Sequence, residues 1–381
     1  MASHIDLKNN LWKETPLIYS NRLSEITGSS VYLKLENLHP SHSFKYRGIS
    51  YFVSDAKVKH GPSVHLVIAS GGNAGLAAAC SARSLGLKCT VFIPQGAAKS
   101  TTELLRREKA EVIVGGKQYS EALERAEALV AKELNAVMVP AYDNSTIWEG
   151  HSSMIHEIHD QLQQVPDAIF CSVGGGGLLG GVIVGCKAVG WDHVPIVALE
   201  TIGADCFYRS MALNGKRFNS ETKTLPPGID LVYNTEHSVH LAHFHSFSSR
   251  ASGSLGASEP SAAVVKMALE RAGGVKTASI PDELSMQTLA LFADDHKFLV
   301  ELACSTTLVP AYHPDFFDKL VEASATKDKN RPVVVFIVCG GFKIDLQIAA
   351  EYRMLAEGDP RGAGESWTVK YDDGQLFSFK K

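Results

Sequence analysis

The chain has 381 residues, of which 45% are hydrophobic and 20% are charged, so a sizeable core can form and extended disorder is not expected. The formal net charge of -4, with mixed signs, leaves no basic surface for nucleic acid. No apolar run reaches the roughly 18 residues that span a bilayer. The N-terminus does not resemble a signal peptide and the cysteines form no C-x-x-C pair, so we expect a cytoplasmic protein with reduced thiols.

The first element with a chemical signature is a lysine at the start of a predicted helix. Ser43 is a candidate cap for a helix that begins at Phe44, which places Lys45 in the first turn. There the helix dipole, aromatic cover and two neighbouring cations, Lys34 and Arg47, would lower the pKa of an ammonium group. Such a lysine can form a Schiff base or act as a general base, although most lysines beside aromatic residues are solvated surface groups.

Strands and helices alternate along most of the sequence. Amphipathic or Ala-rich helical stretches separate the predicted strands, an order that is typical of parallel sheets covered on both faces. We therefore predict an α/β fold. The predicted strands are 31–35, 63–69, 89–93, 111–114, 137–140, 168–173, 194–200, 277–280 and 333–338.

The order of these elements divides the chain into two predicted domains. Residues 49–142 form one compact unit, and residues 1–48 together with 143–357 form a larger one. Segment 216–245 is rich in turn formers and histidines, which predicts a surface insertion. Residues 358–381 begin with a Gly-rich stretch and are predicted to be a mobile tail.

A run of four glycines follows the predicted strand 168–173 and opens a helix. Glycine lets backbone N–H groups approach an anion closely, and a helix N-terminus adds favourable partial charge. We interpret the run as a phosphate-binding loop, with a tight turn that binds nothing as the alternative. The loop comprises Gly174, Gly175, Gly176 and Gly177.

Two further strand ends carry chemical groups. The strand 63–69 is followed by a loop whose hydroxyl, amide and backbone N–H groups can hold a carboxylate at a helix N-terminus, although a plain helix cap is the alternative. This loop comprises Ser70, Gly71, Gly72 and Asn73. The strand 333–338 ends at Cys339, and ligands of open α/β sheets bind at such carboxyl ends.

Five motifs occur in order along the chain: SFKYRG (43–48), SGGNAG (70–75), IWEGH (147–151), SVGGGGL (172–178) and VCGG (338–341). Together they resemble the L-serine/L-threonine dehydratases, which belong to the tryptophan-synthase-β-like, fold-type II pyridoxal-phosphate enzymes. The resemblance covers roughly residues 12–350. It implies two open, mostly parallel twisted sheets flanked by helices, with the cofactor bound by the larger domain and the smaller domain on the substrate side.

The resemblance also implies a role for each site residue. Lys45 would bind pyridoxal 5'-phosphate covalently and then remove the Cα proton of the substrate, while Phe44 would pack against the cofactor ring. Asn73 would donate a hydrogen bond to the phenolic oxygen, residues 174–177 would bind the phosphate, and residues 70–73 would hold the substrate carboxylate. Cys339 would face the pyridine nitrogen. A neutral thiol cannot keep that nitrogen protonated, which favours prompt β-elimination over a long-lived carbanion.

The activity that the resemblance implies is α,β-elimination on a small hydroxy-amino acid. L-serine or L-threonine would give a 2-oxo acid and ammonia, in a homodimer with a role in amino-acid catabolism. One alternative is a β-replacement synthase that traps the aminoacrylate with a nucleophile. Another is a non-catalytic pyridoxal-phosphate-binding protein.

The family also resembles enzymes that use a monovalent cation such as K+. Glu200 stands where the cation-binding carboxylate would lie, with a helix-cap contact as the alternative reading of this residue. Oxygen-only ligation suits a hard cation. The other candidate ligands are the backbone oxygens of Gly174, Ala204, Leu255 and Ala257.

Some positions depart from the family pattern and leave the substrate open. The family motif E-P-A-C-G-A is replaced by residues 301–306, in which Leu302, Ser305 and Thr306 differ, and Phe342 follows the C-G-G motif in place of a small polar residue. We expect Ser305 and Thr306 to narrow or repolarise the substrate pocket. The insertion also carries histidines at a spacing that invites a metal, although no carboxylate or cysteine completes an obvious site. They are His237, His240, His243 and His245.

Overall fold

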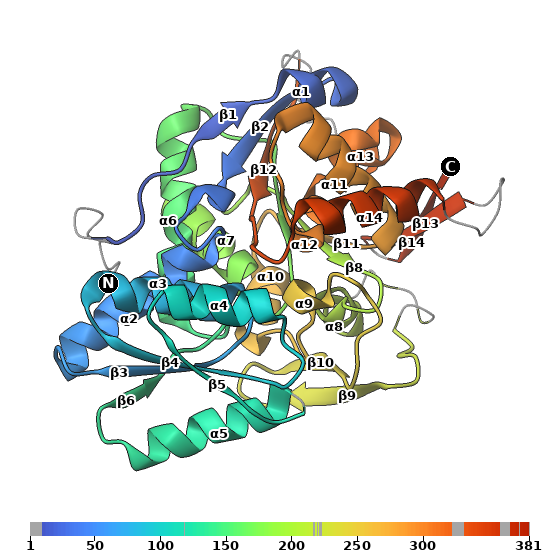
Figure 1. The fold of residues 1–381 in the computed structure, drawn as a ribbon. Helices are drawn as coiled ribbons and strands as arrows, with labels where there is room; N and C mark the ends of the chain where they lie inside the picture. The colour runs from blue at the N-terminus through green and yellow to red at the C-terminus, as the bar shows by residue number, and fades with distance from the viewer. Residues whose placement is uncertain are drawn as a thin grey trace.

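The computed structural model describes residues 10–117, 119–215, 218, 220, 223–321, 331–358, 366–372 and 374–380. Within these ranges the strands form an eight-stranded sheet, a four-stranded sheet and a two-stranded hairpin. Figure 1 shows the two larger sheets with helices packed around them. The prediction of an α/β fold with two open, mostly parallel sheets is therefore confirmed.

The larger sheet is parallel at its centre and antiparallel at both edges. Its central strands, from β2 to β11 in spatial order, run parallel, whereas β1, β13 and β14 pair in antiparallel fashion. In spatial order the strands are β1 (Leu17–Tyr19), β2 (Ser30–Leu35), β12 (Val333–Val338), β7 (Ala168–Ser172), β8 (Ile196–Thr201), β11 (Val275–Ile280), β13 (Ser366–Tyr371) and β14 (Gln375–Lys380).

The smaller sheet is entirely parallel, in the order β5 (Glu111–Val114), β4 (Lys88–Ile93), β3 (His65–Ala69) and β6 (Ala136–Met138). Side chains of β3 alternate between two cores, as the pleat requires. Leu66 and Ile68 pack with the core that includes α2 (Lys45–His60) and α3 (Asn73–Leu85), whereas Val67 and Ala69 pack with α5 (Tyr119–Lys132). Helices therefore cover both faces of the sheet.

Helices also cover both faces of the larger sheet. Figure 1 shows α6 on one side, with α11 and α13 on the other. No described helix is long and apolar enough to cross a membrane. The remaining helices are α1 (Asn21–Thr27), η2 (Glu36–Leu38), α4 (Lys99–Arg107), α6 (Ser145–Leu162), α7 (Gly177–Ala188), α8 (Cys206–Asn214), α9 (Ser252–Leu255), α10 (Ala262–Glu270), α11 (Asp282–His296), α12 (Leu302–Tyr312), α13 (Pro314–Leu320) and α14 (Leu346–Glu357).

The prediction that residues 358–381 form a mobile tail is wrong for the described part of that segment. β13 pairs with β11, and β14 pairs with β13, so this hairpin extends the larger sheet. Trp367, Val369, Tyr371 and Phe379 are buried in the main core. The alternation of apolar and polar residues over 366–371 marks a half-buried strand. Residues 359–365, 373 and 381 lie outside the described residues.

The segment 216–245, predicted as a surface insertion, contains an ordered hairpin of β9 (Ile229–Asn234) and β10 (Val239–Phe244). β10 is largely buried against α8, so the segment is part of the packed structure, while residues 216, 217, 219, 221 and 222 are not described. His243 contacts Glu259 and His245 contacts Asp230. Among the described residues, no cluster of three or more His, Cys, Asp or Glu side chains can hold a metal ion.

Candidate active site

The lysine segment lies at the carboxyl ends of two neighbouring parallel strands, β2 and β12. The backbone N–H of Phe44 donates a hydrogen bond to the carbonyl oxygen of Cys339 at 3.1 Å, and Ser43 forms a β-bridge with Gly340. Ser43 is not the helix cap that the sequence predicts. Phe44 is the N-cap of α2, and the hydroxyl of Ser43 has no partner among the described residues. Backbone pairing with the end of β12, rather than capping, places Lys45 in the first turn.

The surroundings of Lys45 disfavour its charge. Burial lowers the pKa of Lys45 to about 8, and the nearby Cys339 opposes that shift. The Nζ atom donates a hydrogen bond to the carbonyl oxygen of Ala141 at 2.6 Å and lies 5.3 Å from the ring centroid of Phe44. Lys45 therefore has the aromatic neighbour and the lowered pKa that a nucleophilic or basic lysine needs.

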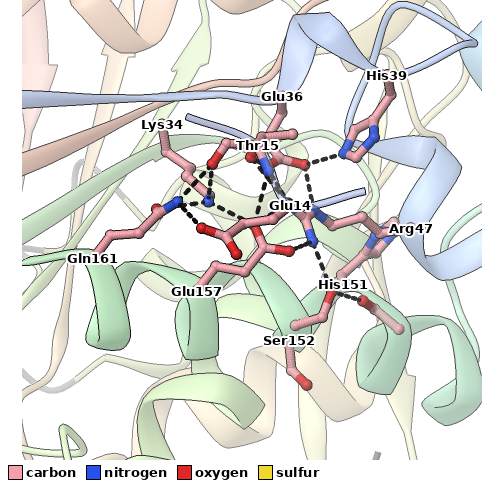
Figure 2. A network of polar contacts seen from close by, with 12 residues as sticks. Glu14, Thr15, Lys34, Glu36, His39, Arg47, His151, Ser152, Glu157 and Gln161 are labelled. Atoms are coloured by element: carbon pink, nitrogen blue, oxygen red, sulfur yellow. Dashed lines mark hydrogen bonds and ion pairs between the residues drawn. The ribbon is translucent and has the colours of Figure 1, made fainter. Parts of the chain in front are cut away.

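The sequence predicts that Lys34 and Arg47 lower the pKa of Lys45, but neither contributes to the shift. Both side chains are instead held in a buried polar network (Figure 2). Arg47 donates from Nε to Glu36 and from Nη1 to Glu157, each at 2.6 Å. Lys34 donates from Nζ to Glu157, also at 2.6 Å. Since Arg47 lies two residues after Lys45, this network holds the first turn of α2 against α6 and the end of β2.

The four-glycine loop joins β7 to α7, and three of its backbone N–H groups are unpaired among the described residues. The carbonyl oxygens of Gly175 and Gly176 accept hydrogen bonds from the backbone of Ser261 at 2.9 Å and of Gly180 at 2.8 Å. Within the described part of the chain, the N–H groups of residues 174–176 have no acceptor. Free N–H groups at a helix N-terminus suit a phosphate, so the residues present fit the cofactor.

Packing within the protein also explains why several of these positions are glycine. A Cβ atom at Gly175 would lie 2.4 Å from the ring of Tyr142, and one at Gly177 would lie 2.9 Å from the Tyr142 Cβ atom. Gly176 has φ of +96°, in the left-handed region that favours glycine. The run of glycines is therefore weaker evidence that the loop binds phosphate than it is when the sequence is read alone. The unpaired N–H groups carry that inference instead.

Ala141 and Tyr142, just after β6, connect the lysine with the glycine loop. Ala141 accepts the hydrogen bond from Lys45, while the ring of Tyr142 packs on the glycine loop. The carbonyl oxygen of Tyr142 accepts a hydrogen bond from Trp148 Nε1 at 2.7 Å. Ala141 and Tyr142 were not predicted from the sequence. A carbonyl and a packing ring have no sequence signature, although Trp148 belongs to a recognised motif.

The predicted carboxylate cradle, residues 70–73, joins β3 to α3. The hydroxyl of Ser70 accepts a hydrogen bond from the N–H of Gly72 at 3.3 Å. The Nδ2 atom of Asn73 donates to both carboxylate oxygens of Glu301 at 3.2 Å, and its Oδ1 accepts from the N–H of Phe342 at 3.2 Å. The cradle thus contacts the segment that follows β12. Glu301 has no role in the sequence analysis beyond its place in a motif.

Cys339 lies at the end of β12, as predicted. It is buried, and its Sγ atom lies 3.5 Å from the hydroxyl of Ser172, the last residue of β7. The backbone of Cys339 also binds the lysine segment, and the Lys45 amine is close enough to interact with it electrostatically. Cys339 therefore lies between the lysine segment and the strand that leads into the glycine loop.

The predicted cation site has a carboxylate that already caps a helix. Glu200 accepts hydrogen bonds from the N–H groups of Phe207, at 3.0 Å, and Tyr208, at 2.5 Å, in the first turn of α8. Burial and the nearby Asp205 raise its pKa well above the usual range. A Cβ atom at Gly174 would lie 2.9 Å from the carbonyl oxygen of Leu255, so these two predicted ligand residues are neighbours.

The departures in residues 301–306 bear on packing within the larger domain. The hydroxyl of Ser305 donates to the carbonyl oxygen of Ser285 in α11 at 2.8 Å, and the hydroxyl of Thr306 lies 2.9 Å from that of Ser285. Leu302 is buried in a small apolar cluster. The expectation that Ser305 and Thr306 repolarise the substrate pocket is therefore wrong, because their hydroxyls bind α11 and the backbone of α12.

Comparisons with known proteins identify the family of this chain. The model of the family "Pyridoxal-phosphate dependent enzyme" matches residues 9–340. The human L-serine dehydratase/L-threonine deaminase is 37% identical over 344 residues, covering 90% of this chain and 94% of the relative. A Saccharomyces cerevisiae L-serine dehydratase is 31% identical over 346 residues, covering 87% of this chain and 93% of the relative.

A solved structure shows that the likeness extends to the fold. A fungal L-serine ammonia-lyase from Rhizomucor miehei superimposes with a TM-score of 0.76 at 31% identity, covering 90% of this chain and 98% of the other. The family model spans most of the chain, and the motifs found in the sequence contain a lysine, a glycine loop and a thiol that the fold brings together. The chain belongs to the family of pyridoxal-phosphate-dependent enzymes.

Proposed function

We propose that this protein is a pyridoxal-phosphate-dependent ammonia-lyase that converts L-serine, and L-threonine as a second substrate, into a 2-oxo acid and ammonia. The observation that carries the proposal is Lys45, whose pKa of about 8 is set by burial at the meeting point of β2 and β12. The relatives named as L-serine dehydratases support the choice of substrate.

In this proposal the residues that hold the cofactor are Lys45, Phe44, Asn73, Cys339 and the glycine loop. When bound, the cofactor supplies an electron sink for the bond that breaks at the substrate Cα atom. Residues 70–73 bind the substrate carboxylate through backbone and side-chain donors at the N-terminus of α3. Such contacts would orient the Cα–H bond for a base at Lys45.

Lys45 has two tasks that its lowered pKa suits. As a neutral amine it would hold the cofactor through its aldehyde group, and when free its Nζ atom would accept the Cα proton of the substrate. The β-hydroxyl would leave as water, with the proton removed from Cα balancing its departure, and the resulting unsaturated amino acid would take up one water to give the 2-oxo acid and ammonia. Cys339 is proposed to face the pyridine nitrogen, where a neutral thiol favours elimination over a persistent carbanion.

We also propose a monovalent cation site, such as one for K+, formed by Glu200 with the carbonyl oxygens of residues 174, 204, 255 and 257. A buried carboxylate beside Asp205, with no cationic side chain within 4.0 Å among the described residues, would be stabilised by a cation.

Further proposals are a cytoplasmic homodimer, a substrate-side domain of residues 49–142, and a cofactor domain of residues 1–48 and 143–357. The four-stranded sheet lies inside the first of these ranges.

The test is to incubate purified protein and cofactor with L-serine, L-threonine and their D-enantiomers, and to measure the 2-oxo acid and ammonia. We expect equal amounts of both products from the L-amino acids, and none with Lys45→Ala. Repeating the reaction with an added thiol separates elimination from β-replacement, since a synthase would yield a thioether amino acid. Covalent binding of the cofactor without any product would overturn the proposal.

A further inference from the structure

Glu301 is a buried carboxylate at the centre of several chain segments around the candidate site. Its exposed fraction is 4%, and it is the N-cap residue of α12. Hydrogen-bond donors reach it from three other segments: Asn73 Nδ2 in α3, Ser254 Oγ in α9, and the N–H of Lys343, at 2.8 Å, after β12. The carboxylate therefore ties the predicted substrate cradle to the end of the larger sheet.

Glu301 is held by hydrogen bonds rather than by an ion pair. Among the described residues, no Lys, Arg or His side chain forms an ion pair with it. Such a buried carboxylate is costly unless its oxygens accept several hydrogen bonds. The backbone makes room for it as well, because a Cβ atom at Gly341 would lie 2.1 Å from the Cδ atom of Glu301. Gly341 also has φ of +126°, which favours glycine.

The consequence concerns the amide of Asn73. Its Oδ1 accepts from the N–H of Phe342 at 3.2 Å, and its Nδ2 faces both oxygens of Glu301. Turning the amide by half a rotation would place its carbonyl oxygen against the carboxylate and its NH2 group against an N–H donor. Both contacts would be repulsive, so only one orientation is compatible with an ionised Glu301.

We propose that Glu301 is a positioning residue that fixes the amide orientation of Asn73, and through it the hydrogen bond that Asn73 donates to the bound cofactor. The proposal rests on the proposed function, which assigns Asn73 to the cofactor. Glu301 acts through Asn73 and needs no contact with the substrate or the cofactor. Its charge matters because a neutral amide in its place could accept or donate, which would leave the selection of the Asn73 orientation to the N–H of Phe342.

The experiment is a double-mutant cycle on the protein loaded with pyridoxal phosphate. Glu301→Gln, Asn73→Ala and the double variant are compared by the absorbance maximum of the bound cofactor and by its dissociation constant, both without substrate. We expect Glu301→Gln to shift the absorbance maximum and to weaken cofactor binding about tenfold. In the Asn73→Ala background the same substitution should have no further effect.

Asp282→Asn is the matched control. Asp282 accepts hydrogen bonds from the hydroxyl of Ser249 and the N–H of Arg250, much as Glu301 does, but does not contact Asn73. We expect this variant to leave the absorbance maximum unchanged. If Glu301→Gln does not fold, the cycle is repeated with Glu301→Asp, which keeps the charge but withdraws the carboxylate from Asn73 by one methylene group, and the same loss of effect is expected in the Asn73→Ala background.

Additive effects of the two substitutions would overturn the proposal, because Glu301 would then act independently of Asn73. An unchanged absorbance maximum in Glu301→Gln would overturn it as well. A failure of the proposed elimination would be seen separately, as intact cofactor binding without any 2-oxo acid from L-serine.

Discussion

The Nζ atom of Lys45 donates a 2.6 Å hydrogen bond to the carbonyl oxygen of Ala141, the neighbour of the residue whose ring supports the glycine loop. The smaller sheet, through the segment after β6, therefore contacts both the candidate covalent site and the candidate phosphate site. A single carbonyl acceptor does not neutralise an ammonium group, which is consistent with the lowered pKa of Lys45.

The first prediction concerns the pH dependence of covalent cofactor binding. Only the neutral amine is nucleophilic, and burial lowers the pKa of Lys45 to about 8 from 10.5. The rate of bond formation with the cofactor should therefore rise about tenfold per pH unit below pH 8 and level off above it. Stopped-flow absorbance between pH 6 and pH 10, with Lys45→Ala as the blank, measures this. A rise that continues to about pH 10.5 would show an unperturbed lysine.

The second prediction concerns the ring that supports the glycine loop. Tyr142→Ala removes the partly buried ring that packs on Gly175, so we expect a loss of about 2–3 kcal/mol in the free energy of unfolding and weaker cofactor binding. Tyr142→Phe is the matched control. It removes only the hydroxyl that donates to Glu259 O at 3.2 Å, which should cost about 1 kcal/mol. Equal cofactor affinity in both variants would contradict a role for the ring in shaping the loop.

These relationships show which parts of the site the sequence could predict. Cys339 and both loops follow strands with mainly apolar sequences, and Lys45 follows a strand in which apolar and polar residues alternate. The carboxyl ends of parallel strands meet at one edge of a sheet, which is why these groups could be grouped from the sequence. Glu301 and Tyr142 could not be found in this way, because their roles depend on contacts between distant segments. The cationic neighbours of Lys45 were misjudged for the same reason, since the sequence does not show that Glu157 neutralises Arg47.

The fold could be predicted to a similar extent. β5 and β12 have the predicted bounds, and the other predicted strands differ from the observed ones by a few residues at their ends. The strands that the sequence analysis missed are β1, β9, β10, β13 and β14. They pair in antiparallel fashion or lie at edges, and their alternation is short. A Gly-rich stretch before residue 366 also favoured a tail over a hairpin.

The third prediction concerns the buried network behind the lysine helix (Figure 2). Glu36→Gln removes the charge that faces the fully buried guanidinium of Arg47, so we expect a loss of about 3–5 kcal/mol in the free energy of unfolding. The control is Asp55→Asn, which breaks the exposed pair with Lys59 and should cost less than about 1 kcal/mol. Urea unfolding without cofactor measures both. Similar losses in the two variants would mean that the network does not hold α2 in place.

The fourth prediction separates a structural hairpin from a tail at the C-terminal end of the chain. Val369 in β13 is fully buried, whereas Leu376 in β14 is 63% exposed. Val369→Ala should therefore lower the free energy of unfolding by about 1–3 kcal/mol, and Leu376→Ala should change it by less than about 0.5 kcal/mol. Both variants remove apolar atoms from the same hairpin, so chemical denaturation compares burial alone. If Val369→Ala is as stable as Leu376→Ala, the hairpin does not contribute to the core. Because β13 pairs with β11, which is parallel to β8, a loss in Val369→Ala should extend inward to β11 and to β8, the central strand that carries Glu200. Faster amide hydrogen exchange in β11 of that variant would show this coupling.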